Sequence, residues 1–388
     1  MQNQNTFSNL SNKEKDIMTV SIIKGLIMDT VRYANSGHTG GPMSSSDFTY
    51  ILYKEFLNFD PNNPNWFNRD RFILSAGHES ALQYVLLTMI GWLELDDLKQ
   101  FRQLHSKTPG HPEIEIDGVE CTTGPLGQGF GMSTGMALAE SFLSNTLKSI
   151  DEEASSLVDH FTYVIASDGD MQEPITLGSA SLSGHLGLSK LIVFYDSNEV
   201  QISGGVSRSD STDYGVVFKG FGWHVQKIDG HDHDSIRIAI RKAQKSNQPS
   251  LIIGETIMAK GSNGMEGDFN THGAPLPQDE IDSTKVKLGI KSEPFYLPEE
   301  VIRYFRSDFQ SQTNKVKSWN NKLTLMQQNL DFKTFWTVAI ENNLPRLEMP
   351  EFDTGASLAT RKAFGTTLDS FSKSLPNMIG GSADLEPS

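Results

Sequence analysis

Residues 161–170 read FTYVIASDGD, a run of apolar and small side chains that ends abruptly in an acidic turn. An apolar run of this length, with no polar alternation, predicts a strand that is buried on both faces. Residues 191–196, LIVFYD, repeat the pattern. Further strands are predicted over 71–75, 224–229 and 250–258, and helices over 11–35, 46–56, 79–89, 131–147, 176–186 and 235–245. Buried strands that alternate with helices predict an α/β fold, with a parallel sheet flanked by helices on both faces.

Polar residues follow two of these strands at the point where each strand ends. Asp168 comes directly after the first strand, and Asn198 follows the second. They are 198 − 168 = 30 residues apart, the length of one β–α–β crossover, so adjacent strand ends would bring them together. Carboxylate and amide oxygens suit Mg²⁺ or Ca²⁺, and Mg²⁺ often also binds phosphate. Either turn alone is most simply a polar strand end, but the pair favours a metal and phosphate site.

Four of the ten histidines lie in turn-like segments rich in glycine: His38, His78, His111 and His272. Imidazoles can donate to phosphate or sugar oxygens and can move protons near neutral pH. One such histidine is most simply solvated, whereas four are harder to dismiss, although the sequence does not place them together. The segment 124–131, GPLGQGFG, would let a flat ligand or a neighbouring subunit approach closely. Close helix packing is its simpler explanation, and neither a GxGxxG nor a P-loop spacing occurs.

Composition excludes several classes of protein. The 388 residues include 33 Lys and Arg against 48 Asp and Glu, a formal net charge of −15. General binding to nucleic acid or to anionic membranes needs the opposite balance. The single cysteine, Cys121, excludes an internal disulfide and is best read as a buried small residue. With no apolar leader near the start and no apolar run of about 18 residues, a soluble cytoplasmic protein is expected.

The chain divides by composition into three parts. We expect a first domain over 1–320, a helical and linker segment over 321–355, and the incomplete start of a second α/β domain over 356–388. The stretch EMPEFDTG at 348–355 has the composition of a linker, and an amphipathic helix is predicted over 358–374. The segment HDHD at 231–234 resembles a metal cluster, but it opens a predicted helix, where Asp and His commonly cap.

Taken together, the motifs resemble those of transketolases, in the same order and over about residues 11–388. They are SGH (36–38), DRFILSAGH (70–78), TPGHPE (108–113), TTGPLGQG (122–129), SDGDMQE (167–173), YDSNEVQI (195–202), THGAPL (271–276), ATRK (359–362) and GGSADLEPS (380–388). TPGHPE followed closely by TTGPLGQG separates the sequence from pyruvate dehydrogenase E1 components and deoxyxylulose-phosphate synthases. Those families share only the general metal and diphosphate motif.

The resemblance implies an activity and its partners. Transketolases bind thiamine diphosphate through a divalent metal, Mg²⁺ or Ca²⁺, in a homodimer whose cofactor lies at the subunit interface. Through a thiamine diphosphate ylid they reversibly move a two-carbon ketol unit from a ketose phosphate such as xylulose 5-phosphate to an aldose phosphate such as ribose 5-phosphate. This is a reaction of the pentose phosphate pathway. A related ketol transferase such as dihydroxyacetone synthase, or a non-catalytic cofactor-binding half that needs a second chain, are the alternatives.

The matching motifs also imply roles for individual residues. The metal would be held by Asp168, Asn198 and the carbonyl of Val200. The cofactor would be contacted by His78, Gly124, Leu126, Gly169, Glu173, Asn198, His272 and Asp384. The sugar would be faced by the catalytic histidines His38, His111 and His272, and its phosphate would be bound by Arg361 and Ser388.

The sequence departs from the family pattern at four positions near these motifs. Thr39 stands where the family usually has Pro, Ser44 where Gly is common, and Ser167 and Pro174 where glycines flank the metal motif. The family's aminopyrimidine-protonating glutamate belongs to a part of the second domain that this sequence does not contain. A truncated piece of a longer protein is therefore expected, in preference to a natural split enzyme.

Overall fold

The computed structural model describes residues 7–381. They form two compact units, and each is described by itself. The first comprises the residues up to Ser141 together with His160–Val316, and the second Phe142–Asp159 together with the residues from Lys317 onward.

The first unit is built on a five-stranded sheet in the order β1-β2-β3-β7-β6, in which every neighbouring pair is parallel. Its strands are β1 (Arg71–Leu74), β2 (Thr162–Ser167), β3 (Leu191–Ser197), β6 (His224–Asp229) and β7 (Ser250–Glu255). The predicted parallel sheet is confirmed, although β7 ends three residues earlier than predicted. β4 (Val200–Gln201) and β5 (Gly204–Gly205) form a separate antiparallel hairpin after β3. Because β2 and β3 are adjacent, their carboxyl ends lie side by side.

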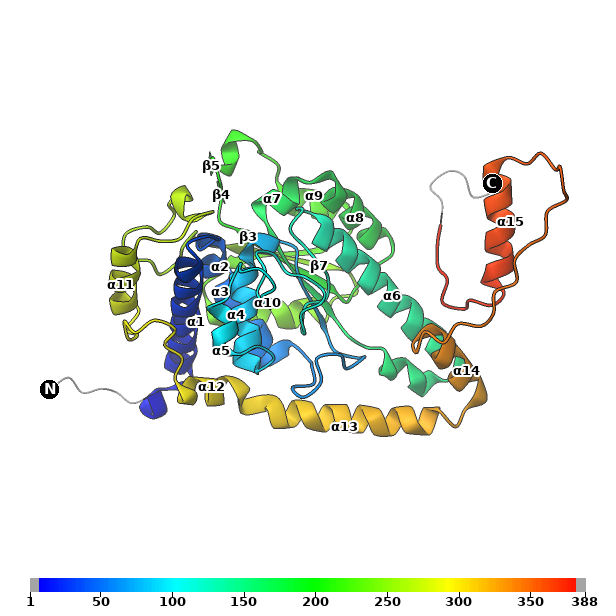
Figure 1. The fold of residues 1–388 in the computed structure, drawn as a ribbon, viewed down its shortest axis with the longest axis horizontal. Coiled ribbons are helices and arrows are strands. Elements are labelled where there is room, and N and C mark those ends of the chain that lie inside the picture. Colours follow the sequence, from blue (N-terminus) through cyan, green and yellow to red (C-terminus); the bar gives the residue numbers. More distant parts are fainter. Residues whose placement is uncertain (1–6, 382–388) are drawn as a thin grey trace. The chain divides into compact units, whose positions relative to one another are not determined.

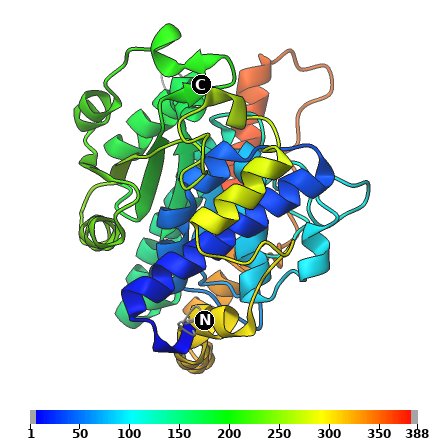
Figure 2. The same ribbon diagram turned by 90° about the vertical axis from the view of Figure 1, so that its left-hand side faces the viewer.

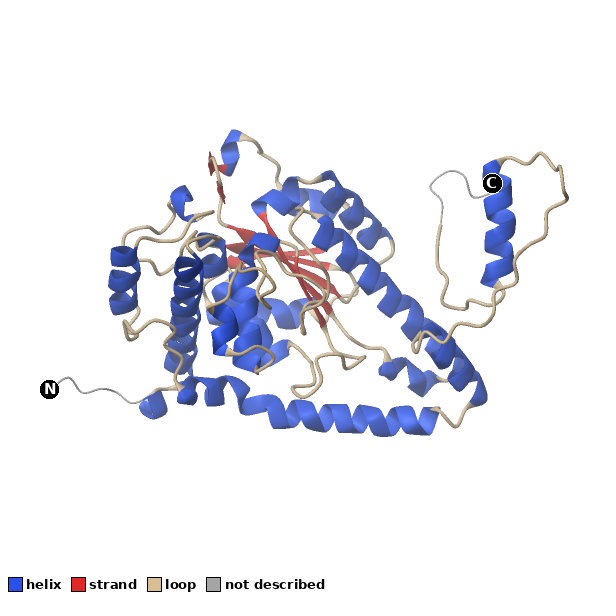
Figure 3. Ribbon diagram, viewed as in Figure 1, coloured by secondary structure: helices blue, strands red, loops and turns tan. Residues whose placement is uncertain are grey.

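Helices cover both faces of this sheet, as predicted (Figures 1 and 3). One face carries α1 (Asn12–Ala34), α3 (Ser46–Ile51), α4 (Ser80–Ile90), α10 (His233–Ala243), α11 (Gln278–Lys287) and α12 (Glu299–Phe305). The other carries the first part of α6 (Gln128–Ile150), α7 (Asp168–Gln172), α8 (Pro174–His185) and α9 (Tyr214–Gly220). Short helices α2 (Gly40–Ser44) and α5 (Leu95–Leu98) complete the unit, and α3 continues as a π-helical turn over Leu52–Phe56.

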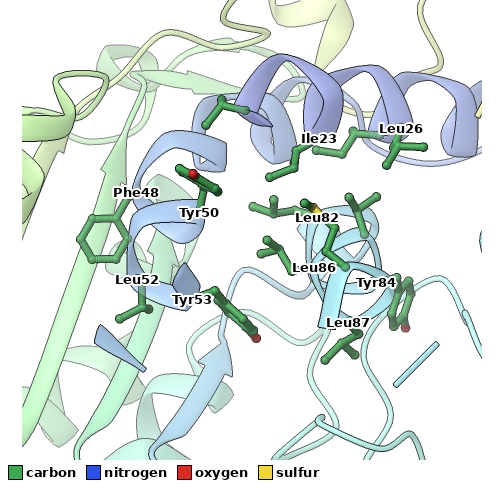
Figure 4. Packing of buried hydrophobic residues seen from close by; sticks show 14 of the residues in the cluster. Ile23, Leu26, Phe48, Tyr50, Leu52, Tyr53, Leu82, Tyr84, Leu86 and Leu87 are labelled. Atoms are coloured by element: carbon green, nitrogen blue, oxygen red, sulfur yellow. The ribbon is translucent and has the colours of Figure 1, made fainter. Parts of the chain in front are cut away.

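Successive side chains of the strands point alternately into two hydrophobic cores, one on each face of the sheet. Phe194 of β3 points to the first face and stacks on Phe48 of α3, with ring centroids 4.0 Å apart. Figure 4 shows this core, where Ile23 and Leu26 of α1 face Leu82 of α4. The second core is smaller, and the neighbouring residues Val193 and Tyr195 point into it. Both faces of β3 are therefore buried, which is why its sequence shows no polar alternation.

Helix α1 begins and ends within one residue of its predicted bounds, 11 and 35. Ser11 and Glu14 form a reciprocal capping box at its start. Asn35 ends the helix, in the left-handed conformation at φ 49°. Asparagine tolerates this conformation better than most residues, so no glycine is needed there. Further along, α1 packs beside α11 (Figure 2), and Asp29 accepts from the buried Lys285 ammonium at 2.7 Å.

The segment 231–234 caps a helix, but only in part as expected. Asp232 is the N-cap of α10 and accepts from the backbone of Ser235. The two histidines instead turn inward to Asp47, with His231 Nδ1 3.0 Å and His233 Nε2 2.9 Å from its carboxylate oxygens. The Lys24 ammonium lies 2.9 Å from the same carboxylate. We call Lys24, Asp47, His231 and His233 the Asp47 cluster.

The second unit contains the end of α6, the end of α13 (Phe309–Met326), α14 (Leu330–Ala339) and α15 (Thr360–Ser372). Its small core is aromatic: Phe332 stacks on Trp336, and Trp319 donates to the Leu157 carbonyl at 3.1 Å. Helix α15, which was predicted over 358–374, has no buried residue within the described part of the chain. Across residues 7–381, no helix combines the length and apolar character needed to cross a membrane.

Candidate functional site

A cavity of about 320 Å³ opens at the carboxyl ends of β2 and β3. Ten of the residues singled out from the sequence line it: His38, His78, His111, Gly124, Leu126, Asp168, Gly169, Asn198, Val200 and His272. They come from segments that are widely separated in the chain. We call this space the histidine cavity. The four histidines, whose convergence the sequence left open, therefore surround the two strand-end turns.

Asp168 sits at the first residue of α7 with a buried and only half-satisfied carboxylate. Its Oδ1 accepts from the Tyr195 hydroxyl at 2.5 Å, a contact that reaches across from β3. Its Oδ2 is buried and has no hydrogen-bond partner within residues 7–381. Burial, with a smaller contribution from the nearby Asp196, raises the pKa of Asp168 to about 7. A bound cation would satisfy a buried carboxylate oxygen of this kind, which has no hydrogen-bond donor.

Asn198 is held in one orientation by its neighbours. Its Nδ2 donates to Asp196 at 2.6 Å, and its Oδ1 accepts from the backbone N–H of Val200 at 3.1 Å. Asp196 is itself fixed by the hydroxyls of Ser44 at 2.6 Å and Thr256 at 2.5 Å. This chain of bonds directs the amide nitrogen to Asp196, and the amide oxygen keeps one lone pair for another partner.

These donors fit a hard divalent cation. Asp168 offers an unpartnered carboxylate oxygen and Asn198 an amide oxygen, and both residues line the same cavity. Among the described residues, no three His, Cys, Asp or Glu side chains are grouped so that they could hold a metal. Any metal here would therefore use amide, backbone and ligand oxygens as well, which is the donor set of Mg²⁺ or Ca²⁺ and not of zinc.

The imidazoles of the histidine cavity are close to one another and neutral. Ring centroids are 5.1 Å apart for His38 and His78, 5.2 Å for His78 and His272, and 5.6 Å for His38 and His272. Burial, followed by the proximity of His272 and Arg102, lowers the pKa of His38 to about 3. Burial also lowers the pKa values of His78, His111 and His272. A neutral imidazole keeps one N–H donor and one acceptor, and Nδ1 of His272 is buried without a partner in the described structure.

Arg102 is a residue of this site that the sequence did not reveal. Its guanidinium donates to the Ser36 hydroxyl at 2.9 Å and lies 3.5 Å from Nδ1 of His38. It supplies a permanent positive charge beside imidazoles that are themselves neutral. Its backbone φ of 61° is rare for a residue with a side chain. Only its position six residues before TPGHPE hinted at a role.

Glycines allow the loops around the histidine cavity to approach one another. Gly124 has φ 140°, and a Cβ there would lie 3.2 Å from the His111 ring. A Cβ on Gly169 would lie 2.7 Å from the Leu126 side chain. The loop is tied to the sheet by Asp170, whose carboxylate accepts from the Gly127 N–H at 2.8 Å. Tight packing and ligand approach, the two explanations left open for this segment, therefore coexist.

The four departures from the family pattern each have a structural account. Thr39 donates to the Ala274 carbonyl at 3.0 Å and so joins the His38 and His272 loops. Ser44 donates to Asp196. Ser167 is the N-cap of α7 and exchanges hydrogen bonds with Asp170. Pro174 is the first residue of α8, where a missing N–H costs nothing.

Four predicted residues are not among those that line the histidine cavity in the described structure. Glu173 is half-buried at the N-cap of α8. Arg361 is exposed in α15 of the second unit. Asp384 and Ser388 fall outside the described residues. Their roles stay predictions.

A second and larger cavity, of about 780 Å³, is also lined by Asp168 and Asn198. Its other charged residues are mainly acidic: Glu199, Asp210, Asp213 and Glu255, against Lys219 and Lys227. This balance disfavours a phosphorylated ligand. The histidine cavity is therefore the better candidate for an anionic cofactor.

Comparison with known sequences agrees with this geometry. Residues 15–344 match the family described as "Transketolase, thiamine diphosphate binding domain". The chain is 43% identical over 380 residues to a transketolase of Staphylococcus aureus strain MRSA252, which covers 96% of this chain and 57% of that protein. It is 41% identical over 384 residues to a transketolase of Halalkalibacterium halodurans, with 97% and 57% covered. The chain thus spans a little over half the length of these relatives.

Solved structures give the same picture. A transketolase from Campylobacter jejuni superposes with a TM-score of 0.88 at 37% identity, over 97% of this chain and 58% of that one. A Pichia stipitis transketolase in complex with sedoheptulose 7-phosphate gives a TM-score of 0.91 at 35% identity, over 96% and 56%. Within the matched portion, the arrangement of sheet, helices and loops is that of these enzymes.

Proposed function

Because this chain belongs to the transketolase family, we propose that it binds thiamine diphosphate with Mg²⁺ or Ca²⁺ and forms the cofactor-binding part of a transketolase. The proposed reaction is the reversible transfer of a two-carbon ketol unit from a ketose phosphate to an aldose phosphate. One observation carries the proposal: Asp168, whose buried Oδ2 has no partner within residues 7–381, lines a cavity together with Asn198 and four histidines.

The residues that would hold the metal are Asp168, Asn198 and the carbonyl of Val200. Tyr195 and Asp196 support this set, because each fixes one of its side chains through a hydrogen bond. A bound cation would keep Asp168 ionised despite the burial that raises its pKa. His78, His272 and the backbone at Gly169 would face the diphosphate, with Gly124 and Leu126 against the rings.

Thiamine diphosphate, when bound, supplies a carbon nucleophile for the sugar carbonyl and a sink for the electron pair released by C–C cleavage. The protein must then hold and move protons on the sugar hydroxyls. His38 and His111 are suited to this, because a neutral imidazole can accept a proton at one nitrogen while it donates from the other. The Arg102 guanidinium would stabilise negative charge that develops on a sugar oxygen next to His38.

Phosphorylated sugars are the proposed substrates. Transketolase structures of Pichia stipitis that resemble this chain are described as complexes with fructose 6-phosphate, sedoheptulose 7-phosphate and xylulose 5-phosphate. Arg361 would bind the phosphate group, since a guanidinium can contact two of its oxygens in one plane. The chain's Arg102 adds positive potential at the histidine cavity.

A homodimer is proposed for the same protein. Four apolar side chains on α6 and α8 or at their ends are between 41% and 49% exposed: Met132, Ile175, Leu182 and Leu186. Large apolar side chains that stay this exposed on helices beside the cavity-bearing loops favour an interface. Glu173, the N-cap of α8, would then lie near that interface.

Isothermal titration calorimetry on the chain tests cofactor binding. We expect thiamine diphosphate to bind when Mg²⁺ is present and to bind much more weakly with a chelator. Asp210→Asn is the matched control for the variant Asp168→Asn. Asp210 also accepts from a tyrosine hydroxyl, that of Tyr214, but it does not line the histidine cavity. Absence of metal-dependent binding would contradict the proposal.

The transfer reaction needs its own test in the full enzyme. Xylulose 5-phosphate and ribose 5-phosphate should yield sedoheptulose 7-phosphate when a chain with the length of its relatives is assayed. Binding without turnover would instead support the alternative of a non-catalytic half. Turnover with formaldehyde but not with ribose 5-phosphate as acceptor would support a dihydroxyacetone synthase.

A further inference from the structure

Glu79 is a buried acid that no role described so far uses. It directly follows His78 and ends the short 3₁₀ turn Gly77–Glu79. Its side chain is 0% exposed. The carboxyl group packs against Gly41 in the first turn of α2, where a Cβ would lie 3.0 Å from Glu79 Oε1. Glu79 therefore occupies the space between the His78 turn and the α2 residues that lead to Ser44.

Neither oxygen of Glu79 has a hydrogen-bond partner within residues 7–381, and no cation pairs with it there. The buried hydroxyl of Ser45 faces it as a donor, although the two groups do not form a well-aligned hydrogen bond in the described structure. The charged groups that act on Glu79 are the carboxylates of Asp196 and Asp170. A buried carboxylate with a single hydroxyl donor and with two like charges nearby is strongly unfavourable.

The two neighbouring carboxylates are in the opposite situation. Asp196 accepts from three side chains, those of Ser44, Asn198 and Thr256. Asp170 accepts from the hydroxyls of Ser75 and Ser167 and from two backbone N–H groups. The available donors thus mainly stabilise negative charge on the two aspartates and, in the described structure, leave the Ser45 hydroxyl alone for Glu79. Burial, followed by the charge of Asp196, raises the pKa of Glu79 well above its usual range.

We propose that Glu79 is a positioning residue that remains a neutral carboxylic acid behind the metal-binding turn, and that its hydrogen-bonding head group, more than its bulk, keeps Asp196 and Asn198 in place. The inference rests on the proposed function, because it concerns the same cation site. A neutral acid can donate to and accept from the Ser45 hydroxyl. It also avoids placing a second negative charge beside Asp196, whose carboxylate orients the Asn198 amide.

Two isosteric variants separate the head group from its bulk. Glu79→Gln keeps a neutral, hydrogen-bonding group of the same size. Glu79→Met keeps the bulk and removes the polar atoms. A space-filling role would be preserved in both variants, whereas the proposed role is preserved in Gln alone.

The first measurements use the chain without any cofactor. Infrared difference spectra of wild type minus Glu79→Gln at neutral pH should contain the carbonyl band of a protonated carboxyl group. The side-chain amide NMR signals of Asn198, identified by their loss in Asn198→Ala, should be unmoved in Glu79→Gln and displaced in Glu79→Met. Absence of the infrared band, or unchanged amide signals in the Met variant, would overturn the proposal.

The second measurement titrates Mn²⁺, with thiamine diphosphate present, by water-proton relaxation. Loss of a group that orients a metal ligand typically lowers affinity about 10- to 100-fold, so we expect that loss in Glu79→Met and a change under about threefold in Glu79→Gln. Equal affinity in the two variants would overturn the proposal. If wild type itself binds no Mn²⁺, the proposed function fails, while the infrared and amide measurements still decide the state and role of Glu79. Should the Met variant not fold, the Gln variant and the infrared band remain decisive.

Discussion

Histidines and carboxylates gather twice in the first unit, with opposite outcomes. In the Asp47 cluster every charged oxygen is satisfied: Asp47 accepts from Lys24, His231 and His233, and Nε2 of His231 accepts from the Ile257 N–H at 2.9 Å. In the histidine cavity and at Arg102 beside it, polar atoms of Asp168, Arg102 and His272 are buried without partners in the described structure.

The difference indicates what each cluster is for. A closed network of hydrogen bonds stabilises the fold, and nothing remains for a ligand to satisfy. Orphaned polar atoms around an open space cost stability and are retained where a ligand completes them. The residue types alone do not separate the two cases. The segment HDHD looks more like a metal site than the spaced pair Asp168 and Asn198, yet its histidines are structural.

The sharpest test of this contrast is Asp47→Ala, which leaves the Lys24 ammonium buried and unpaired. Breaking a buried ion pair typically costs about 3–5 kcal/mol, and we expect a loss of that size in the free energy of urea unfolding. Asp234→Ala removes an exposed aspartate that pairs at the surface with Lys13 and Arg237 and is the control, with an expected change below about 1 kcal/mol. Similar losses in the two variants would remove the distinction between the clusters.

The opposite pattern is expected for Asp168→Asn. Orienting groups around a metal are worth about 10- to 100-fold in affinity, so loss of a direct carboxylate ligand should lower Mg²⁺-dependent binding of thiamine diphosphate at least about 100-fold. The stability of the cofactor-free chain should fall little or rise, since the buried charge is removed. Calorimetry and urea unfolding of the same samples measure both quantities. A large loss of stability without loss of binding would reverse the assignment.

Acid should affect the histidine cavity before it affects the Asp47 cluster. The folded state holds the pKa of His38 near 3, below its ordinary value of 6.5, so His38 favours folding above pH 6.5 and this contribution is lost as the pH falls toward 3. The expected loss is on the order of 1 kcal/mol within about one pH unit below 6.5. His38→Asn should flatten the slope of stability against pH over this range, and exposed His185→Asn should not.

For Asp47 the corresponding window lies lower. Burial would raise the pKa of Asp47, but the Lys24 ammonium and the two histidines outweigh burial and hold it well below its usual range. A depressed carboxylate stabilises the fold above the unfolded-state pKa of about 3.9 and loses that contribution only at lower pH. A single transition shared by both clusters above pH 4 would contradict this order.

The smallest effect concerns Thr39, which joins two loops of the histidine cavity. Thr39→Val removes its hydrogen bond to Ala274 at nearly constant volume, and a typical loss is about 1 kcal/mol of unfolding free energy. Thr324→Val, which removes an exposed bond to Asn320 within a helix, is the control and should change stability less. Equal losses of unfolding free energy in the two variants would show that the contact between the loops stabilises the fold no more than an exposed hydrogen bond does.

The parallel sheet could be predicted from the sequence because the composition of each strand shows that the strand is buried. The runs at 161–167 and 191–196 are apolar on both faces, and only a covered parallel sheet accommodates them. The pairing of Asp168 with Asn198 followed from crossover length, since adjacent parallel strands end at one edge. The helix predicted over 11–35 likewise begins where expected, with Ser11 as its N-cap.

The roles of residues that depend on their tertiary neighbours could not be predicted from the sequence. Tyr195 reads as one more apolar strand residue until β3 lies beside β2 and its hydroxyl meets Asp168. Arg102 and Glu79 are ordinary residues until the loops around them close. The inward turn of His231 and His233 depends on Asp47, which is 184 residues away from His231. No local pattern encodes such contacts.

The bond between Tyr195 and Asp168 ties ligand binding to correct folding. Tyr195 pairs with Ala166, so its side chain and the start of α7 meet only in this alignment of the two strands. A slip of one residue would turn the tyrosine to the opposite face and leave Asp168 without its support. A chain with misaligned strands could still be compact, but it would bind its cation weakly. Cofactor affinity thus reports on the register of β2 and β3. It would reveal a misaligned pair of strands that a measurement of compactness would miss.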